Sequence, residues 1–511
     1  MTRALISVSD KTGIVELGKA LVRAGIEIVS TGGTYKALSQ AGVAVTEVSA
    51  ITGFPEMMDG RVKTLHPMIH GGLLALRDET SHMQAIKEHG IGLIDFVIVN
   101  LYPFAKTIAN PDVVLEEAIE NIDIGGPSML RAAAKNYRFV VTAVDPADYP
   151  MIIAKLDNKE PFSEEERFLL CAKVFRHTAK YDAIIADYLT KKTGAAYPED
   201  LTVAFTKVQG LRYGENPHQT AAFYQSHFAE TPSLVDATQV QGKELSYNNI
   251  QDAGAAIDLI TEFDQPTVVA LKHMNPCGVG TGDSIFEAWE RAYAADPISI
   301  FGGIVASNRE VTEEMAQALT ELFLEIVIAP SFTEGALERL SKKKNVRVLL
   351  LPSLNREVMR RFAMKSVTGG FLVQDADAKT IGVEDLKVVT KRKPTEQEVN
   401  ELLFAWRVVK HVKSNAIVLT KEGQTIGVGA GQMNRVGAAK IAIEQAGDLS
   451  RGSVMASDAF FPMPDTVEEA VKAGVTAIIQ PGGSIKDQAS IDVADEHGIA
   501  MVFTGVRHFK H

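Results

Sequence analysis

The chain has 511 residues, of which 46% are hydrophobic, and its formal net charge is −12. This length exceeds what one core usually holds and predicts roughly two to four globular units, while the acidic balance argues against a general nucleic-acid or membrane-surface binder, which would carry a basic excess. The two cysteines form no CxxC pair, and the most apolar stretch, residues 91–104, is interrupted and too short to span a bilayer. A disulfide framework, a zinc knuckle and a membrane segment are therefore not indicated, and we expect a cytoplasmic protein.

Short β-rich runs alternate with amphipathic stretches over the first 190 residues or so. Strands are predicted at residues 4–8, 27–30, 96–99 and 139–142, and helices at residues 13–24 and 113–120. This alternation predicts a parallel sheet flanked by helices. A long helix is expected from Ser163 to Leu189, where Ser163 and Glu166 form a capping box. The polar segment that follows predicts a domain boundary after residue 195.

The remaining chain of more than 300 residues alternates strands and helices again. Strands are predicted at residues 267–271, 303–306, 326–328, 346–351, 416–419, 477–479 and 500–503. This length implies two layered α/β subdomains rather than one, with a seam near Lys391. The lysine run at residues 342–344 is most simply the solvated end of a helix.

A glycine-rich turn follows the second predicted strand. Small residues there let backbone amides approach a phosphate, and hydroxyl groups with the N-terminus of a following helix would complete an anion site. An ordinary strand-to-helix turn with Thr34 as its N-cap has the same pattern. The first strand is followed by a similar arrangement, in which Lys11 is available to a second anionic group. The candidate substrate-binding residues in these two turns are Ser7, Lys11, Ser30, Thr31, Gly33 and Thr34.

Chemical groups also occur in three later segments of the first domain. Arg61 and Lys63 are two residues apart, so an extended backbone would point both cations the same way. Tyr102 ends another predicted strand, and Asp123 precedes a predicted helix that carries Lys135. We expect strand ends and helix starts to bring these groups together. The candidate catalytic residues are Lys63, Tyr102, Asp123 and Lys135, and Arg61, Thr64 and Gly125 are further substrate-binding candidates.

In the second part, the apolar strand predicted at residues 267–271 delivers Lys272 and His273 to its carboxyl end. Open α/β sheets place their ligands at such ends. The cation next to the imidazole disfavours the charged imidazolium and leaves a base that can take a proton from an amine. A structural or solvated Lys-His pair would have the same sequence.

Further candidates lie in loops next to predicted strands. They are Arg212, Tyr213, Phe301, Gly302, Asn415, Arg435, Phe460 and Asp465. The glycines of residues 427–435 resemble a dinucleotide motif, but GxGxxG requires glycine in place of Asn434, and the helix-opening context is poor. No P-loop motif occurs. His66 and His70 are separated by a proline and form a weak metal-site pattern.

Taken together, the motifs identify a family. SVSDKTG, STGGT, GRVKTLHP, NLYPF and IDIGGPSMLRAAAKN are followed by LRYGENPHQ, LKHMNPCG, DPISIFGG, SNAIVL, GAGQMNR and SDAFFPMPD. In this order they resemble the bifunctional purine biosynthesis family in which AICAR (phosphoribosylaminoimidazolecarboxamide) formyltransferase is fused to IMP cyclohydrolase. The resemblance covers essentially the whole chain. It implies an α/β fold, with a methylglyoxal-synthase-like cyclohydrolase domain at residues 1–195 and a formyltransferase domain of two cytidine-deaminase-like subdomains at residues 196–511.

The resemblance also implies ligands, roles and an assembly. The co-substrate would be 10-formyltetrahydrofolate, no catalytic metal is expected, and the formyltransferase sites of a homodimer would lie between subunits. Lys272 and His273 match the catalytic pair of the family, with Asn415 nearby. Arg212 and Arg507 match family residues that hold the AICAR phosphate. The positions that match residues around AICAR or the folate are Phe301, Arg435, Phe460 and Asp465. Glu325 stands where some relatives carry aspartate, which leaves its role near the folate open.

Two other functions fit parts of the pattern. A deaminase-like hydrolase joined to a phosphate-binding lyase would hold zinc, although the zinc-ligand motif H-x-E with P-C-x-x-C is missing. A regulatory nucleotide sensor would bind its ligand without turnover. The family resemblance instead predicts formyl transfer from the folate to AICAR, followed by closure of formyl-AICAR to IMP with loss of water.

Overall fold

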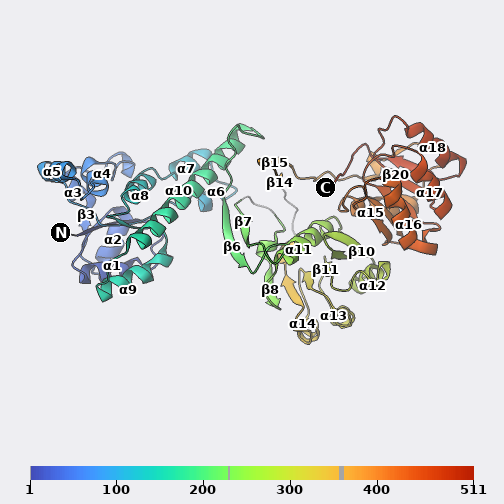
Figure 1. Ribbon diagram of the computed structural model, residues 1–511, viewed down its shortest axis with the longest axis horizontal. Helices are drawn as coiled ribbons and strands as arrows, with labels where there is room; N and C mark the ends of the chain where they lie inside the picture. Colours follow the sequence, from blue (N-terminus) through green and yellow to red (C-terminus); the bar gives the residue numbers. More distant parts are fainter. Residues whose placement is uncertain (1, 228–230, 356–361) are drawn as a thin grey trace. The chain divides into compact units, whose positions relative to one another are not determined.

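The computed structural model describes residues 2–227, 231–355 and 362–511. The chain divides into two units, Met1–Phe205 and Thr206–His511 (Figure 1). The boundary expected after residue 195 falls between the last helix of the first unit, α10 (Glu164–Thr193), and strand β6 (Phe205–Leu211).

The first unit is built on a five-stranded sheet with the order β3-β2-β1-β4-β5. Its strands are β1 (Arg3–Val8), β2 (Glu27–Ser30), β3 (Thr46–Glu47), β4 (Phe96–Asn100) and β5 (Val141–Ala143). Every neighbouring pair is parallel, which confirms the predicted parallel sheet. The strand order reverses between β1 and β4, and this is the point where such sheets bind ligands outside their carboxyl ends.

Helices cover both faces of this sheet because side chains alternate along its strands. The helices are α1 (Ile14–Arg23), α2 (Gly32–Gln40), α3 (Val48–Thr52), α4 (Pro67–Leu74), α5 (Thr80–Glu88), α6 (Phe104–Ile108), α7 (Leu115–Glu120), α8 (Gly125–Lys135), α9 (Tyr149–Asn158) and α10. In β1, Ala4, Ile6 and Val8 pack in one core with α1 and α9, whereas Leu5 packs in a second core with α4, α8 and α10. The predicted capping box of α10 is confirmed, because Ser163 Oγ accepts a hydrogen bond from the Glu166 amide.

The second unit contains a twelve-stranded sheet with the order β16-β21-β20-β19-β17-β18-β10-β9-β11-β12-β13-β8. Its strands are β8 (Thr238–Gln241), β9 (Thr267–Lys272), β10 (Asn275–Thr281), β11 (Ile304–Ser307), β12 (Ile326–Ala329), β13 (Arg347–Leu350), β16 (Lys387–Val388), β17 (Ile417–Lys421), β18 (Gln424–Gly429), β19 (Val454–Ser457), β20 (Ala477–Gln480) and β21 (Ala500–Phe503). Smaller elements are the hairpins β6 with β7 (Ala221–Ser226) and β14 (Phe362–Val367) with β15 (Gly370–Asp375), and the 3-10 turns η1 (Met58–Gly60), η2 (Pro146–Asp148), η3 (Leu234–Asp236), η4 (Pro352–Asn355), η5 (Val383–Asp385) and η6 (Gly447–Ser450).

The large sheet consists of two halves with the same topology. Each half has a hairpin, β9–β10 or β17–β18, whose first strand pairs antiparallel with the first of three parallel strands. An antiparallel edge strand, β8 or β16, completes each half, and β10 pairs with β18 where the halves meet. The predicted seam near Lys391 lies just after β16, which pairs within the second half.

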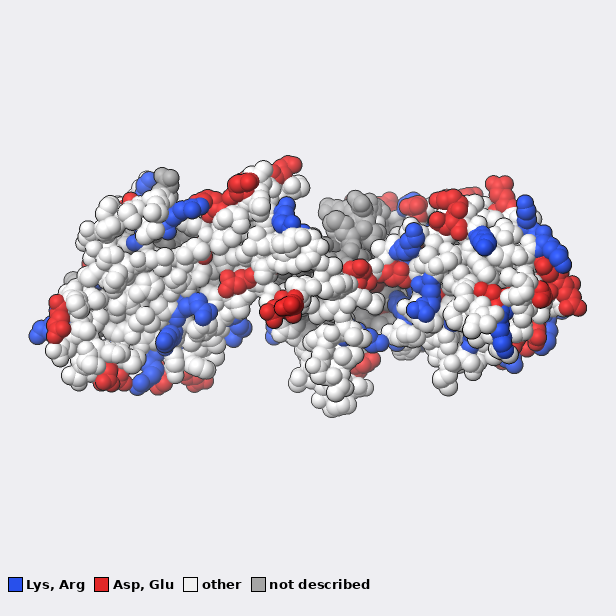
Figure 2. Space-filling model, turned by 90° about the horizontal axis from the view of Figure 1, so that it is seen from above, with Lys and Arg blue, Asp and Glu red and all other residues white. Residues whose placement is uncertain are grey.

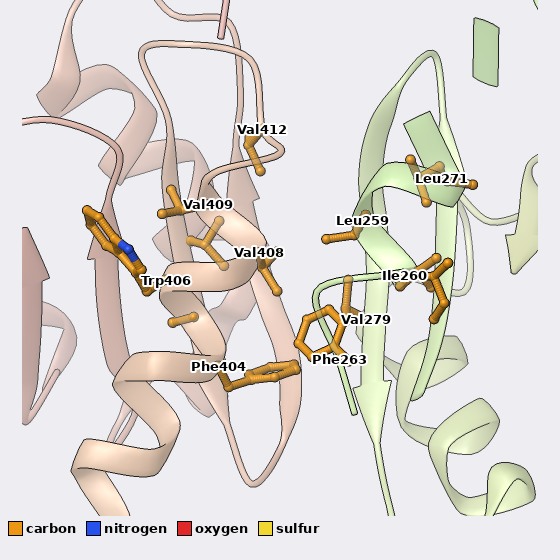
Figure 3. Close-up of a cluster of buried hydrophobic side chains, with 14 of the residues drawn as sticks. Leu259, Ile260, Phe263, Leu271, Val279, Phe404, Trp406, Val408, Val409 and Val412 are labelled. Atoms are coloured by element: carbon orange, nitrogen blue, oxygen red, sulfur yellow. The ribbon is translucent and has the colours of Figure 1, made fainter. Parts of the chain in front are cut away.

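One helix of each half lies on the inner face of this sheet, and α11 (Tyr247–Ile260) and α15 (Glu396–Val409) share a single core. Figure 3 shows Leu259 of α11 and the following Phe263 on the side that faces Phe404 and Val408 of α15. The rings of Phe263 and Phe404 are 5.7 Å apart. The outer face carries α12 (Ile285–Ala295), α13 (Glu313–Thr320) and α14 (Glu334–Ser341) in the first half, and α16 (Arg435–Ala446), α17 (Asp465–Ala473) and α18 (Asp487–Glu496) in the second.

Glycines let the first outer helix of each half lie directly on its hairpin. A Cβ added to Gly278 of β10 would overlap the carbonyl of Ala292 in α12, and one added to Gly429 of β18 would overlap the carbonyl of Ala438 in α16. The segment after Gly429 therefore does open a helix, and Asn434 caps α16 by accepting a hydrogen bond from the Gly437 amide at 2.7 Å. Our expectation that this segment does not open a helix was therefore wrong. The glycines of β18 allow α16 to pack closely on the strand.

A buried ion cluster also joins the ends of α11 and α15. Glu262 Oε1 accepts hydrogen bonds from Lys410 Nζ at 2.8 Å and from His411 Nε2 at 2.9 Å. Burial lowers the pKa of His411, and the hydrogen bond to Glu262 opposes that effect. No helix among the described residues combines the length and apolarity needed to cross a membrane.

Candidate functional site

In the first unit, polar groups surround the N-terminus of α2 at the carboxyl ends of β1 and β2. The hydroxyls of Ser7 and Thr31 are 3.1 Å apart. A Cβ added to Gly32 would lie 3.6 Å from Lys63 Nζ, and one added to Gly33 would lie 3.8 Å from Lys11 Nζ. Two ammonium groups and two hydroxyls therefore flank free backbone amides at a helix start, an arrangement that suits a phosphate.

Two predicted members of this cradle have other partners. Ser30 is fully buried and donates to the carbonyl of Ile6 at 2.7 Å. Thr34 lies inside α2, is also buried, and exchanges hydrogen bonds of 3.0 Å with the backbone of Val8. The expectation that these hydroxyls face the substrate differs from the structure, because both hydroxyls are bonded to the backbone of β1, at Ile6 and at Val8.

A second group of side chains gathers around the N-terminus of α8. Asp123 Oδ1 accepts from the Gly126 amide at 2.7 Å, and the backbone of Tyr102 also donates to this carboxylate. Burial raises the pKa of Asp123, and these two backbone donors offset part of that effect. The Tyr102 side chain is 46% exposed, and Thr64 Oγ1 would lie 2.9 Å from a Cβ at Gly125. Because Thr64 follows Lys63 directly, this acid, phenol and hydroxyl adjoin the phosphate cradle.

Arg61 and Lys63 do not point the same way, which corrects the sequence prediction. Arg61 forms an ion pair with Glu120, whereas Lys63 Nζ lies 3.1 Å from Glu56 Oε1. The prediction assumed an extended backbone, but Arg61 has helical dihedral angles after the 3-10 turn η1, where Gly60 has a φ of 91°. Each cation therefore meets a separate carboxylate.

Lys135 lies apart from the other three candidate catalytic residues. It is at the last turn of α8, about 15 Å along the helix from Gly125 at a rise of 1.5 Å per residue. There it lines a cavity of about 550 Å³ together with Arg131 and Cys171. Within a single chain, α8 therefore does not bring Lys135 next to Asp123 as predicted, because only the first turn of α8 faces the sheet edge.

In the second unit, strand directions bring nearly all candidates to one edge of the large sheet. Strands β9, β18, β19 and β21 all end at this edge, whereas β11 and β17 begin there. The residues that follow or precede these strand ends are Lys272, His273, Phe301, Gly302, Asn415, Arg435, Phe460, Asp465 and Arg507. Arg212 and Tyr213 are at the end of β6, in a separate hairpin, where the Arg212 guanidinium lies 4.8 Å from the Tyr213 ring.

Lys272 and His273 occupy the tight turn between β9 and β10. Lys272 Nζ donates to the carbonyl of Phe301 at 2.8 Å. His273 and Met274, the two central residues, have φ values of 53° and 62°. Such a turn matches the twist of a hairpin, but it usually contains glycine or asparagine because the left-handed conformation costs other residues about 1–2 kcal/mol each. The imidazole is thus presented on a strained backbone.

A cavity of about 520 Å³ adjoins this turn. Its lining includes Lys272, His273 and Asn275 from the hairpin, together with Asp296 and Glu444. Asn275 Oδ1 accepts from the Lys413 amide at 3.0 Å, which ties the hairpin to the segment that carries Asn415. A cation, an imidazole and two carboxylates therefore border one opening.

Asn415 is held by a buried guanidinium. Arg435 donates to Asn415 Oδ1 at 2.8 Å, forms an ion pair with Asp458, and is only 6% exposed. Arg435 therefore orients Asn415 through this hydrogen bond. Asp458 was missed as a single residue, although it follows β19 within the motif SDAFFPMPD, and that position was the signal that could have identified it.

The remaining candidates are more exposed. Phe301 is 57% exposed with its ring 5.5 Å from Phe323, and Phe460 is 37% exposed. The guanidinium of Arg507 lies 4.4 Å from the Phe509 ring. Glu325, just before β12, forms a 2.7 Å ion pair with Arg347. Exposed aromatic rings at a sheet edge can stack on a planar heterocycle.

Surface charge and the side chains at the two sites indicate which ligands and reactions the protein suits. On the face shown in Figure 2, acidic and basic side chains are interspersed, and no continuous basic band crosses its described residues. In the described ranges, no group of three His, Cys, Asp or Glu side chains is arranged to hold a metal ion. The two sites offer cations, hydroxyls, a carboxylic acid and an imidazole, which suit phosphate binding and proton transfer.

Two family models match parts of the chain, and curated relatives match its whole length. A family model described as "AICARFT/IMPCHase bienzyme" matches residues 133–445, and one described as "MGS-like domain" matches residues 13–128. The chain is 64% identical over 511 residues to the "Bifunctional purine biosynthesis protein PurH" of Anoxybacillus flavithermus, covering 100% of this chain and 99% of the relative. It is 62% identical over 509 residues to the protein of the same description from Bacillus cytotoxicus, with the same coverage. A solved structure, "Crystal structure of ForH", is 36% identical with a TM-score of 0.34, covering 36% of this chain and 95% of that chain.

Proposed function

Because the chain belongs to the AICARFT/IMPCHase bienzyme family, and is therefore an AICAR formyltransferase and IMP cyclohydrolase of purine biosynthesis, we propose which residues carry each reaction. Residues 1–195 form the cyclohydrolase domain, and residues 196–511 form the formyltransferase domain. The first assignment is supported by the MGS-like match at residues 13–128, which contains Thr31, Gly32, Gly33 and Lys63 of the phosphate cradle. The second is supported by the Lys272–His273 turn beside its cavity.

In formyl transfer, the 5-amino group of AICAR attacks the formyl carbon of a folate-type donor, which we propose is 10-formyltetrahydrofolate. A carbon–nitrogen bond forms to the amine, and the bond to the folate nitrogen breaks. His273 accepts the amine proton, while Lys272 stabilises the developing oxyanion or protonates the departing nitrogen. Lys272 now donates to the carbonyl of Phe301, so its ammonium is held beside the imidazole. The amine is conjugated and weakly nucleophilic, which makes positioning as important as basicity.

In cyclisation, the carboxamide nitrogen attacks the formyl group of the same molecule, and water is lost. Because this step is intramolecular, orientation and polarisation suffice. Lys63 and the α2 cradle hold the phosphate, while Tyr102 and Asp123 face the reacting end. The raised pKa of Asp123 supports a role in proton transfer, since a carboxyl group closer to neutral pH serves both as an acid and as a base. Lys135 keeps its proposed role only if a second chain or a movement of α8 brings it to this site.

We propose that the formyltransferase site is completed by a second copy of the chain. Lys272 follows β9 and Arg507 follows β21, six strand positions away in the sheet. At about 4.8 Å per strand, these positions are about 29 Å apart along the sheet, farther than one nucleotide reaches. If Arg507 holds the phosphate of AICAR while Lys272 acts at its amine, the two residues must come from different subunits of a homodimer.

The single observation that carries the proposal is the Lys272–His273 turn beside its cavity, and His273→Ala tests it. Formyl transfer should fall by about 10²- to 10⁴-fold, while cyclisation of supplied formyl-AICAR is retained. Loss of both activities in a folded protein would contradict two separate sites, and retained formyl transfer would contradict the role of His273.

A cytoplasmic location is part of the proposal and is supported by the two free thiols, Cys171 and Cys277.

A further inference from the structure

We propose that Asp252 is a positioning residue for formyl transfer, because its carboxylate holds the left-handed turn that presents His273. This inference rests on the proposed role of His273 as the base. Asp252 lies in the second turn of α11, whereas His273 lines the cavity; in the described part of the chain, Asp252 is not among the residues of that lining. It therefore acts through the turn rather than on the substrate.

The contact is made to the backbone of the turn. Asp252 Oδ1 accepts a hydrogen bond from the Met274 amide at 2.7 Å, and the backbone of His273 also donates to this carboxylate. Burial raises the pKa of Asp252, while the Met274 amide and the nearby His273 lower it. One carboxylate thus satisfies both central amides of the turn and lies close to the imidazole itself.

This turn needs support that other turns do not. Among the described residues, His273 and Met274 are the only two consecutive residues other than glycine with positive φ. Side chains disfavour that conformation, so the turn persists only where surrounding contacts hold it. A change of either φ by tens of degrees would swing the imidazole away from Lys272 and the cavity.

The second half of the sheet provides an internal comparison. Its hairpin turn reads Lys421-Glu422-Gly423, and the Gly423 amide donates to Glu401 Oε2 at 3.0 Å. Asp252 and Glu401 are both the sixth residue of their helices, α11 and α15. The lysines also correspond, because Lys421 Nζ donates to the carbonyl of Arg451 at 3.0 Å, as Lys272 does to Phe301.

Comparing the two halves shows which features of the turn belong to the fold and which occur only beside the proposed reaction site. Each acceptor, Phe301 or Arg451, stands three residues before the next strand of its half. The helix carboxylate, the turn and the lysine are therefore repeated features of the fold, whereas the imidazole occurs only in the first turn. Glu401 can serve as a matched control for Asp252, because its loss removes an equivalent contact far from the proposed chemistry.

The test uses the full-length protein with saturating folate donor and with AICAR varied up to saturation. Asp252→Ala should lower kcat for formyl transfer by about 100-fold with little change in the KM for AICAR, because a displaced base impairs chemistry more than binding. Asp252→Asn should restore kcat to within about 5-fold of the wild type, since its amide oxygen can accept the same hydrogen bond. Glu401→Ala should leave kcat near the wild-type value, and cyclisation should be unchanged in all three variants.

Several results would overturn the inference. The first is a wild-type kcat for formyl transfer in Asp252→Ala. The second is a loss of kcat in Asp252→Asn as large as that in Asp252→Ala. The third is an equally large loss of kcat in Glu401→Ala when both variants are folded to the same extent. If Asp252→Ala does not fold, Asp252→Ser, whose hydroxyl is too short to reach the turn, carries the same expectation. His273→Ala separates the two proposals: if it is inactive while Asp252→Ala is active, only this inference fails, and if His273→Ala is itself active, the proposed role of His273 fails first.

Discussion

Replacing Glu262 by glutamine should destabilise the second unit, because it removes the carboxylate at the centre of the ion cluster that joins α11 and α15. Lys410 and His411 both donate to Glu262 Oε1, and both side chains are at most 10% exposed. An amide keeps the size of the group but removes the charge. The Lys410 ammonium would then be buried beside a neutral oxygen, which is the costly half of a broken buried pair.

The magnitude follows from the titration of this carboxyl. Burial alone would raise the pKa of Glu262, but the hydrogen bonds and charges of His411 and Lys410 outweigh it and lower the pKa to about 2 from an ordinary 4.5. At 1.36 kcal/mol per unit, the ionised carboxylate contributes about 3 kcal/mol, the size expected when a buried pair is broken. A unit of roughly 300 residues has an unfolding entropy of about 0.6 kcal/mol/K, so its Tm should fall by about 5 °C.

The stabilisation by Glu262 should depend on pH in one direction only. A carboxyl whose folded pKa is lowered stabilises the protein above its unfolded pKa and loses that effect as the pH falls toward the folded value. The difference in unfolding free energy between the wild type and Glu262→Gln should thus be complete at pH 7.5 and should shrink only between about pH 4.5 and pH 2. Calorimetry and urea unfolding at several pH values would measure it.

A surface pair provides the control. Glu469 pairs at 2.9 Å with Lys472, three residues later on α17; the Lys472 side chain is 68% exposed and that of Glu469 is 24% exposed. Glu469→Gln makes the same chemical change and should leave the Tm nearly unchanged, because exposed pairs contribute little. The reasoning is refuted if Glu262→Gln unfolds at the wild-type temperature at pH 7.5, or if the two variants lose the same stability.

Three further predictions follow from the structure. Lys272→Met should lower kcat for formyl transfer by about 10²- to 10⁴-fold, whereas Lys421→Met, at the corresponding turn of the second half, should keep the wild-type rate in the same assay; equal losses would contradict the assignment. A fragment of residues 1–200 contains both cores of the first unit and should fold and convert formyl-AICAR to IMP, as measured by circular dichroism and product formation; an insoluble fragment, with neighbouring end points also failing, would count against the boundary. Gly429→Ala should destabilise the second unit by about 1–3 kcal/mol in urea unfolding because the new methyl overlaps α16, whereas Gly254→Ala, which meets nothing within 4 Å on α11, should not; a neutral Gly429→Ala would refute the packing argument.

The sequence predicts most of what depends on local pattern. Apolar runs located β1, β4, β9 and β21, and the end of such a run pointed to Lys272 and His273. The capping box at Ser163 located the start of the 30-residue helix α10. These features were accessible because hydrophobic periodicity and helix caps are properties of neighbouring residues.

Features that depend on distant residues were not accessible. Strand β10 was missed because Pro276 and its glycines depress strand propensity, and its need for those glycines comes from α12. Lys135 was placed with Asp123 because the sequence does not show which turn of a helix faces the site. Asp252 and Glu262 are ordinary acidic residues in or after a helix, and only the fold reveals what they contact.

The doubled half-sheet also bears on the conformation of the active turn. A single half would leave the inner face of its one helix uncovered, and α11 and α15 cover this face for each other. Each half therefore supplies the cover that a partner chain would otherwise have to supply. The hairpin of the second half reads Glu422-Gly423, where glycine adopts positive φ without a side-chain penalty. In the described ranges, left-handed backbone at two adjacent side-chain-bearing positions therefore occurs only in the hairpin that presents His273.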